Sequence, residues 1–275
     1  MTPDAALLPE TPLARLRWAV LDAWTVALRA LLHWARQPGQ VVFGLLFPIM
    51  TLLMFGYLFG GQMALPGGGD YIDFLVPGMF AMTMLFGVEA TVLAVTTDAA
   101  RGVTERFRSM PMAPSAVVVG RSLADMLNSV LGLAVMVAAG LAVGWRWHDG
   151  AARALLAVGL LLLLRFAFVW VGIYLGLLLK SPEAAVAVQI LVWPVGFVSS
   201  AFVEPGTMPD WLGTIAAWNP LSTTVTTTRE LFANPGWGGE SWIVQHAAPM
   251  AVVWPLLLVA VFLPLSVRRY RHLSR

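Results

Sequence analysis

Long apolar runs separated by short polar segments dominate the chain. Each run is close to the roughly 20 residues that a helix needs to cross the hydrocarbon core of a bilayer. The pattern therefore predicts an all-α, polytopic integral membrane protein with six transmembrane helices. The predicted spans cover residues 40–60, 71–97, 122–145, 151–179, 184–203 and 247–267.

The segment before the first span has a different pattern. Residues 1–10 form a proline-containing tail, and residues 11–37 read as an amphipathic helix that Pro38 ends. Charged residues recur every seven positions along one face of this helix, and tryptophans lie among the apolar residues. Such a helix is typical of the membrane interface, although packing on a partner or on the protein's own loops would need the same pattern. Residues 38–275 then form the transmembrane domain.

Two connecting segments stand out from the rest. Residues 98–121 are the only strongly charged segment between two long apolar ones, so this loop cannot lie in lipid. Residues 204–246 mix Pro, Gly, Trp and Thr. Within them, 211–218 and 221–232 are expected to form short helices, a re-entrant or interfacial pair on the outer side before the last span.

The distribution of basic residues predicts the orientation. Six spans place both termini on one side, and that side then carries thirteen Lys and Arg residues against three on the other. The positive-inside rule makes the first side cytoplasmic. Its basic residues are Arg15, Arg17, Arg29, Arg36, Arg101, Arg106, Arg108, Arg121, Lys180, Arg268, Arg269, Arg271 and Arg275, against Arg146, Arg153 and Arg229 outside.

The composition narrows the chemistry. Only 12% of the residues are charged and none is cysteine, which excludes disulfide scaffolds and thiolate metal sites. The four histidines are far apart and lack partners at metal-ligand spacing, so no metal site is predicted. The only lysine, Lys180, does not follow a glycine-rich phosphate loop. We therefore expect no cofactor bound directly. The arginines cluster in a few loops, a distribution that topology explains better than nucleic-acid binding.

Two charges fall at membrane depth, Glu89 in the second span and Arg165 in the fourth. A charged side chain there costs at least a few kcal/mol, about 2.5 on insertion scales, so each should face a partner or a cavity. They could line a transport path, or they could have a structural role, as an ion pair or in separate snorkelling contacts. The structural role is the favoured interpretation.

The charged loop carries the most specific motif. It reads Asp98-x-x-Arg101-Gly102-Val103-x-Glu105-Arg106-Phe107, then Met110-Pro111 and Gly120-Arg121. A short amphipathic helix that ends at a proline would fit this pattern. The loop resembles the cytoplasmic coupling loop of bacterial ABC exporter permeases of the second type, close to the daunorubicin-resistance permease family.

The resemblance extends over nearly the whole chain. Near the last span, the most distinctive match is Asn219-Pro220 followed by Arg229-Glu230-Leu231-Phe232, which we name the outer motif. Further matches, in order, are Arg36-x-Pro38, Gly144-Trp145-Arg146, Leu175-Gly176, Ser181-Pro182-Glu183, residues 194–202 and Met208-Pro209-x-Trp211-Leu212.

The resemblance implies a permease without ATPase activity of its own. It would work as two permeases, a homodimer or a pair of paralogues, with two copies of a separate ABC ATPase that supplies ATP and Mg²⁺. The ATPase would dock on the coupling loop, with Asp98, Arg101, Gly102, Glu105, Arg106, Phe107 and Pro111 as candidate coupling residues. The location implied is the bacterial inner membrane.

The resemblance also implies the substrate class. The expected function is export of an amphipathic drug-like or lipid-like compound, and a glycolipid or polysaccharide exporter is the alternative on the same fold. A polytopic membrane enzyme would need a cluster of acid, base or metal ligands, and the sequence offers none. A secondary transporter would favour internal symmetry and several proton-relay carboxylates, whereas Glu89 stands alone.

Overall fold

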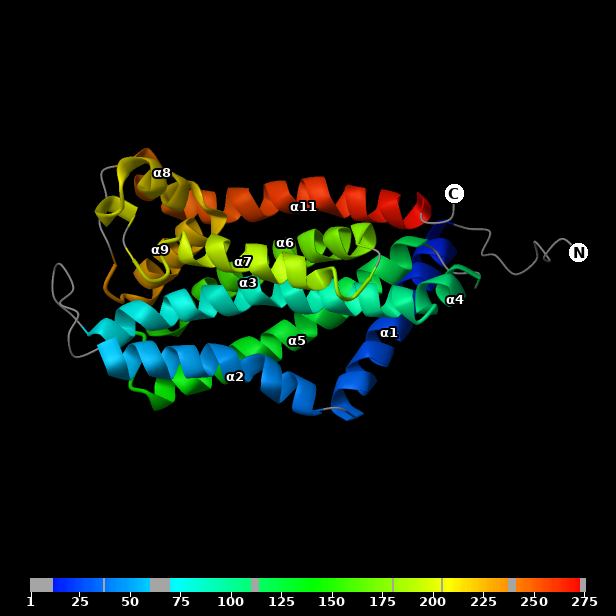
Figure 1. The fold of residues 1–275 in the computed structure, drawn as a ribbon, viewed down its shortest axis with the longest axis horizontal. Helices are drawn as coiled ribbons and strands as arrows, with labels where there is room; N and C mark the ends of the chain where they lie inside the picture. The colour runs from blue at the N-terminus through cyan, green and yellow to red at the C-terminus, as the bar shows by residue number, and fades with distance from the viewer. Residues whose placement is uncertain are drawn as a thin grey trace, which may run out of the picture.

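The computed structural model describes residues 12–36, 38–59, 70–109, 114–179, 181–203, 205–236 and 241–272, and these are helical without any strand. The helices form an elongated bundle (Figure 1). Their bounds are α1 Pro12–Arg36, α2 Pro38–Met54, η2 Phe55–Phe59, α3 Tyr71–Ala100, α4 Val103–Ser109, α5 Pro114–Ala142, α6 Gly150–Leu178, α7 Ala185–Phe197, η3 Pro205–Thr207, α8 Asp210–Trp218, α9 Pro220–Phe232, α10 Trp242–Gln245 and α11 Ala247–His272.

In the described part of the chain, four helices are long and apolar enough to cross a membrane: α3, α5, α6 and α11. They coincide with the second, third, fourth and sixth predicted spans. The predicted first and fifth spans correspond to shorter apolar helices, at Gly44–Leu58 and Ala185–Phe197. The protein is therefore a helical membrane protein with several membrane-length helices.

Two helices differ in extent from the predicted spans. The third span was expected from residue 122, but α5 starts at Pro114 and includes the last part of the predicted coupling loop. Proline suits the first turn of a helix, and a polar face on this turn finds partners on neighbouring helices. The fifth span was expected to reach residue 203, but α7 ends at Phe197. There the Ser199 hydroxyl donates to the Gly196 carbonyl (2.6 Å) and the chain turns.

The short helices between the fifth and sixth spans are confirmed as elements. The expected helices at 211–218 and 221–232 are α8 and α9. They lie with α10 at one end of the bundle, and α4 lies at the other end beside parts of α1, α5 and α11 (Figure 1). The molecule thus has two structurally different ends joined by the long helices.

Helix α3 is the centre of the bundle. Its residues 74–82 are buried on every side, and it packs closely along α6. Glycines on α6 allow this approach, since a Cβ at Gly172 would lie 2.9 Å from the Cβ of Thr91 and one at Gly176 would lie 2.7 Å from the Cβ of Val95. Small residues four positions apart commonly let membrane helices pack closely.

This packing generates a stability prediction. Gly176→Leu should force α6 away from α3, at a cost of about 1–3 kcal/mol for overpacking, and lower the melting temperature in detergent by roughly 3–10 °C. Gly159→Leu is the matched control on the same helix, because a Cβ there meets no atom within 4 Å. Equal melting temperatures for the two variants would contradict the proposed role of this contact.

Candidate functional site

The predicted coupling segment, residues 98–121, begins in the last turn of α3. Arg101 closes α3, and Gly102 adopts a left-handed conformation (φ 67°) that turns the chain into α4. A glycine accepts this conformation without the steric cost that a Cβ brings. Helix α4 covers only seven residues. The turn therefore places a short helix across the end of the long ones. The predicted coupling residue Pro111 lies outside the described residues.

The predicted coupling residues do not share one role in the fold. Asp98 forms ion pairs with Arg29 of α1 (3.4 Å) and Arg121 of α5 (3.6 Å). The Arg29 guanidinium also lies over the Phe107 ring, 5.4 Å from its centroid. Asp98 and Phe107 thus fasten the coupling segment to the protein itself.

The remaining described members of the predicted coupling set lie at the surface. Arg101, Gly102, Glu105 and Arg106 are exposed, and Glu105 and Arg106 also interact within the chain. Their mixed charge on a short helix is suited to electrostatic docking of another protein. The structure therefore separates an inward-facing pair, Asp98 and Phe107, from an outward-facing group. We name this outward-facing group, Arg101, Gly102, Glu105 and Arg106, the α4 surface.

A track of polar residues leads from this end into the bundle. Arg121, Asp125 and Ser129 follow one another at four-residue spacing on α5, which places them on one helix face. Arg121 pairs with Asp125 (3.1 Å), whose side chain is only 5% exposed. Arg165 of α6 is buried and donates to the Ser129 hydroxyl (2.7 Å) and to the Thr91 hydroxyl (2.9 Å). This polar track connects the α4 end to the interior of the bundle.

Glu89 has different partners from Arg165. The side chain of Gln189 on α7 acts as a hydrogen-bond donor to the Glu89 carboxylate, while Arg165 contacts Ser129 and Thr91. One carboxylate oxygen, Oε1 of Glu89, is buried without a hydrogen-bond partner in the described part of the chain. The structure does not bring the two intramembrane charges together as a pair.

Aromatic rings adjoin Glu89 and Gln189. Phe86 precedes Glu89 by about one turn of α3, and Trp193 follows Gln189 by about one turn of α7. The Trp193 ring contacts those of Phe86 (5.2 Å between centroids) and Phe47 (4.8 Å). Gln189 is exposed on the surface of α7. The Glu89 carboxylate, the Gln189 amide and these aromatic rings are therefore neighbours at the exposed surface of α7. We name this group the α3–α7 polar site.

The outer motif is a structural joint. Asn219 caps α9 by accepting from the backbone N–H of Leu221 (2.9 Å), and its Nδ2 donates to the carbonyls of Val195 (2.8 Å) and Val198 (2.7 Å). Pro220 occupies the first turn of α9, where a missing N–H costs nothing. These bonds tie the end of α7 to the start of α9.

Arg229 is the second part of that joint. Its side chain is fully buried and donates to the carbonyls of Phe74 (2.9 Å), Ser200 (2.8 Å) and Ala201 (2.9 Å), and it lies 3.7 Å from the Phe74 ring centroid. Burial lowers the pKa of Arg229 to about 9, so the guanidinium remains charged at neutral pH. Its neighbour Glu230 points outward and is exposed. The two residues of the motif thus have separate roles.

Several residues of these sites were not selected from the sequence. Arg121 was identified as a basic loop residue and as part of the Gly120-Arg121 match, but not as a site residue, and Asp125, Ser129 and Gln189 were not considered at all. The four-residue spacing on α5 was a signal that could have identified the polar track. Gln189 carried no comparable signal, since only the packing of α7 on α3 places it beside Glu89.

The family model described as ABC-2 type transporter matches residues 22–232. The daunorubicin resistance ABC transporter permease protein DrrB1 of Streptomyces coeruleorubidus is 33% identical over 256 residues, 92% of this chain and 87% of that protein. A putative transport permease, ycf38 of Cyanophora paradoxa, is 23% identical over 79% of this chain and 76% of its own. The probable doxorubicin resistance ABC transporter permease protein DrrC of Mycobacterium tuberculosis is 19% identical over 73% of each chain.

The geometry of Arg229 generates a prediction. Arg229→Lys keeps the charge but cannot direct donors at all three carbonyls, and each hydrogen bond from a charged group contributes about 1.5–3 kcal/mol. We expect a loss of roughly 3 kcal/mol, measured as a lower melting temperature in detergent. Arg153→Lys is the control, since Arg153 is exposed on α6 and pairs with Asp149. A melting temperature for Arg229→Lys equal to that of the control would refute the structural role.

Proposed function

The chain belongs to the ABC-2 type transporter family, and on that premise we propose that it is the permease subunit of an ATP-driven exporter in the bacterial inner membrane. In this arrangement α2 and α7 complete a set of six spans with α3, α5, α6 and α11. Both termini and α4 face the cytoplasm, and α8, α9 and α10 lie at the outer face. The excess of basic residues in the termini and in the charged loop supports this orientation.

The observation that carries the proposal is the position of α4. It lies at the end of the long helices α3 and α5, and Asp98 and Phe107 bind the segment to Arg29 and Arg121. A push on the α4 surface would therefore reach α1, α3 and α5 together. Two copies of a separate ABC ATPase would supply that push, with ATP and Mg²⁺ bound by the ATPase.

The working unit would contain two permeases, either two copies of this chain or one copy with a paralogue. Small ATP-driven changes at an interface can be transmitted by rigid helices that have two packing arrangements. In this proposal α1 lies along the inner membrane interface, where it contacts lipid and packs on α5. The two permeases together enclose the transport path.

The proposed substrate is an amphipathic drug-like or lipid-like compound taken from the cytoplasm or the inner leaflet. The α3–α7 polar site supports this, because a carboxylate and an amide beside aromatic rings suit a molecule with a flat apolar body and a polar or cationic group. The names of two relatives refer to daunorubicin and doxorubicin resistance, which fits the same class.

The coupling proposal is tested by a charge swap on the α4 surface. Glu105→Arg combined with Arg106→Glu should weaken co-purification with the ATPase and reduce permease-stimulated ATP hydrolysis by about tenfold, as loss of complementary interface charges does. Arg153→Glu, at the opposite end of the bundle, is the control and should leave both unchanged. If assembly and stimulated hydrolysis persist in the swapped variant, the docking assignment is wrong.

The substrate path is tested at Glu89. Glu89→Gln should reduce ATP-dependent transport of ethidium, a flat permanent cation, by about tenfold, the equivalent of one lost ion pair of roughly 1.4 kcal/mol. Glu230→Gln is the control, because it removes the same charge from an exposed carboxyl group on α9, outside the α3–α7 polar site. A purely structural Glu89 would instead lower the melting temperature, and transport of cationic and neutral compounds would fall equally.

A further inference from the structure

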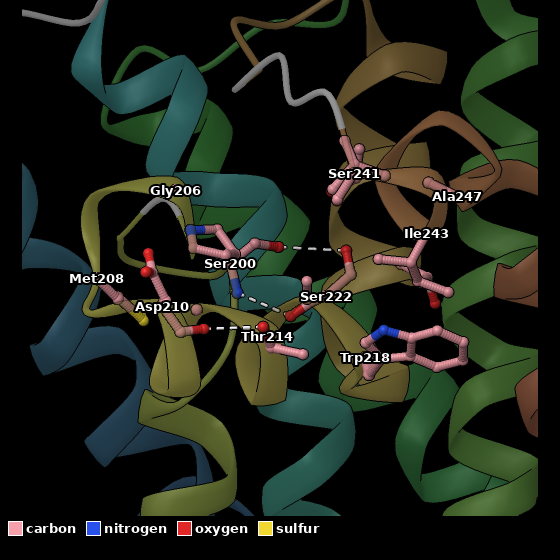
Figure 2. Close-up of a pocket in the computed structure, with 16 residues that line it drawn as sticks. Ser200, Gly206, Met208, Asp210, Thr214, Trp218, Ser222, Ser241, Ile243 and Ala247 are labelled. Atoms are coloured by element: carbon pink, nitrogen blue, oxygen red, sulfur yellow. Dashed lines mark hydrogen bonds between the residues drawn. The ribbon is translucent and has the colours of Figure 1, made fainter.

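A cavity of about 300 Å³ lies at the end of the bundle opposite to α4. Its walls come from η3 and α8 on one side and from α10 and the start of α11 on the other, with Ser200 and Ser222 between them (Figure 2). Pockets that hold small molecules start at about this volume. The cavity is separate from the α3–α7 polar site and from the α4 surface.

Hydroxyl groups give the cavity an acceptor-rich lining. The Thr214 hydroxyl donates to the Asp210 carbonyl (2.8 Å), and the Ser200 hydroxyl donates to the Ser222 carbonyl (3.2 Å) (Figure 2). The Thr223 hydroxyl donates in the same way to the Pro220 carbonyl (3.1 Å). A hydroxyl group that already donates its hydrogen to a carbonyl still has oxygen lone pairs that can accept a hydrogen bond. These groups therefore offer acceptors to whatever enters the cavity.

The charge of the lining has one sign. Among the described residues that form the walls, Asp210 is the charged one, and no Arg, Lys or His is present. Asp210 is exposed at the start of α8, so its carboxylate can meet a ligand from solution. A phosphate or carboxylate ligand would meet repulsion here and would find no basic side chain. The cavity therefore selects against anions.

An aromatic ring completes the lining. Trp218 belongs to the cavity wall and is 49% exposed. Its ring stacks on that of Trp242, 6.3 Å between centroids, which holds it in place. A tryptophan face attracts cations and also packs on the C–H face of a sugar-like ring. Both properties favour a compact, donor-rich ligand.

We propose that this cavity binds a hydroxylated ammonium group, which brings O–H and N–H donors to the hydroxyl acceptors and a positive charge to Asp210. Two sources can bring the ammonium group. One is the polar end of an exported amphiphile, which can also carry hydroxyls, and the other is the head group of a membrane lipid, whose phosphate would have to remain outside the cavity. The first source rests on the proposed export function. The binding itself does not, because it requires the permease alone.

The test uses the full permease in nanodiscs of phosphatidylglycerol, with three matched probes: glucosamine, glucose and glucose 6-phosphate. Saturation-transfer NMR titrations are made at mildly acidic pH, where the amine is protonated. Glucosamine should bind about three- to tenfold more tightly than glucose, the value of one partly exposed ion pair, and glucose 6-phosphate most weakly. Equal or tighter binding of glucose 6-phosphate would overturn the proposal.

Two variants link the binding to the cavity. Asp210→Asn should reduce glucosamine binding to the level of glucose, whereas Asp149→Asn, an exposed acid outside the cavity wall, should leave the preference intact. Trp218→Leu should weaken both sugars together. Unchanged glucosamine preference in Asp210→Asn, with an unchanged melting temperature, would also overturn the proposal.

The lipid arm identifies the source of the ammonium group. If the source is a lipid, phosphatidylethanolamine that replaces part of the phosphatidylglycerol should compete with glucosamine for the unmodified protein. It should not compete in Asp210→Asn. Absence of competition assigns the site to an exported compound. These assays contain no ATPase. Failure of the unmodified permease to bind an ABC ATPase would therefore refute the exporter proposal and leave the binding result intact.

Discussion

Three buried or half-buried arginines hold this apolar bundle together at three positions along its length. Each of them has at least one partner on another segment of the chain. Arg121 joins Asp98 and Asp125 near α4, Arg165 bonds Ser129 and Thr91 in the interior, and Arg229 bonds three backbone carbonyls near α8. A guanidinium that loses its partners in an apolar surrounding costs several kcal/mol. The helices must therefore pack so that these partners remain in place.

The two ends of the molecule are built with different strengths. At the α8–α10 end, each side-chain nitrogen of Arg229 and of Asn219 donates to a backbone carbonyl and Arg229 is buried, so the joint is rigid. At the α4 end, the Arg29–Asp98 pair is 50% and 31% exposed, and such exposed pairs contribute only about 0–1 kcal/mol. This difference fits the proposal that an ATPase docks at the α4 end, where the structure would rearrange while the opposite end holds its shape.

Much of the helical structure could be predicted because it depends on local pattern. The bounds of α3 and α6 were correct within three residues, and α8 and α9 were expected from the break at Asn219-Pro220. The differences between the predicted spans and the helices α5 and α7 share a cause. A polar turn such as the one holding Arg121 becomes helical when distant Asp98 pairs with it, and an apolar run such as 198–203 can turn when local hydroxyls bond its backbone.

The sequence by itself determined that the chain is a helical membrane protein of a recognisable permease type, because apolar run length, positive charge and ordered motifs are readable along one dimension. Only the tertiary structure decided which side chains meet. It placed Gln189 beside Glu89, and Ser129 and Thr91 beside Arg165. It also divided the predicted coupling residues into an inward-facing and an outward-facing group. Partner choice depends on contacts between segments tens of residues apart, which no local pattern encodes.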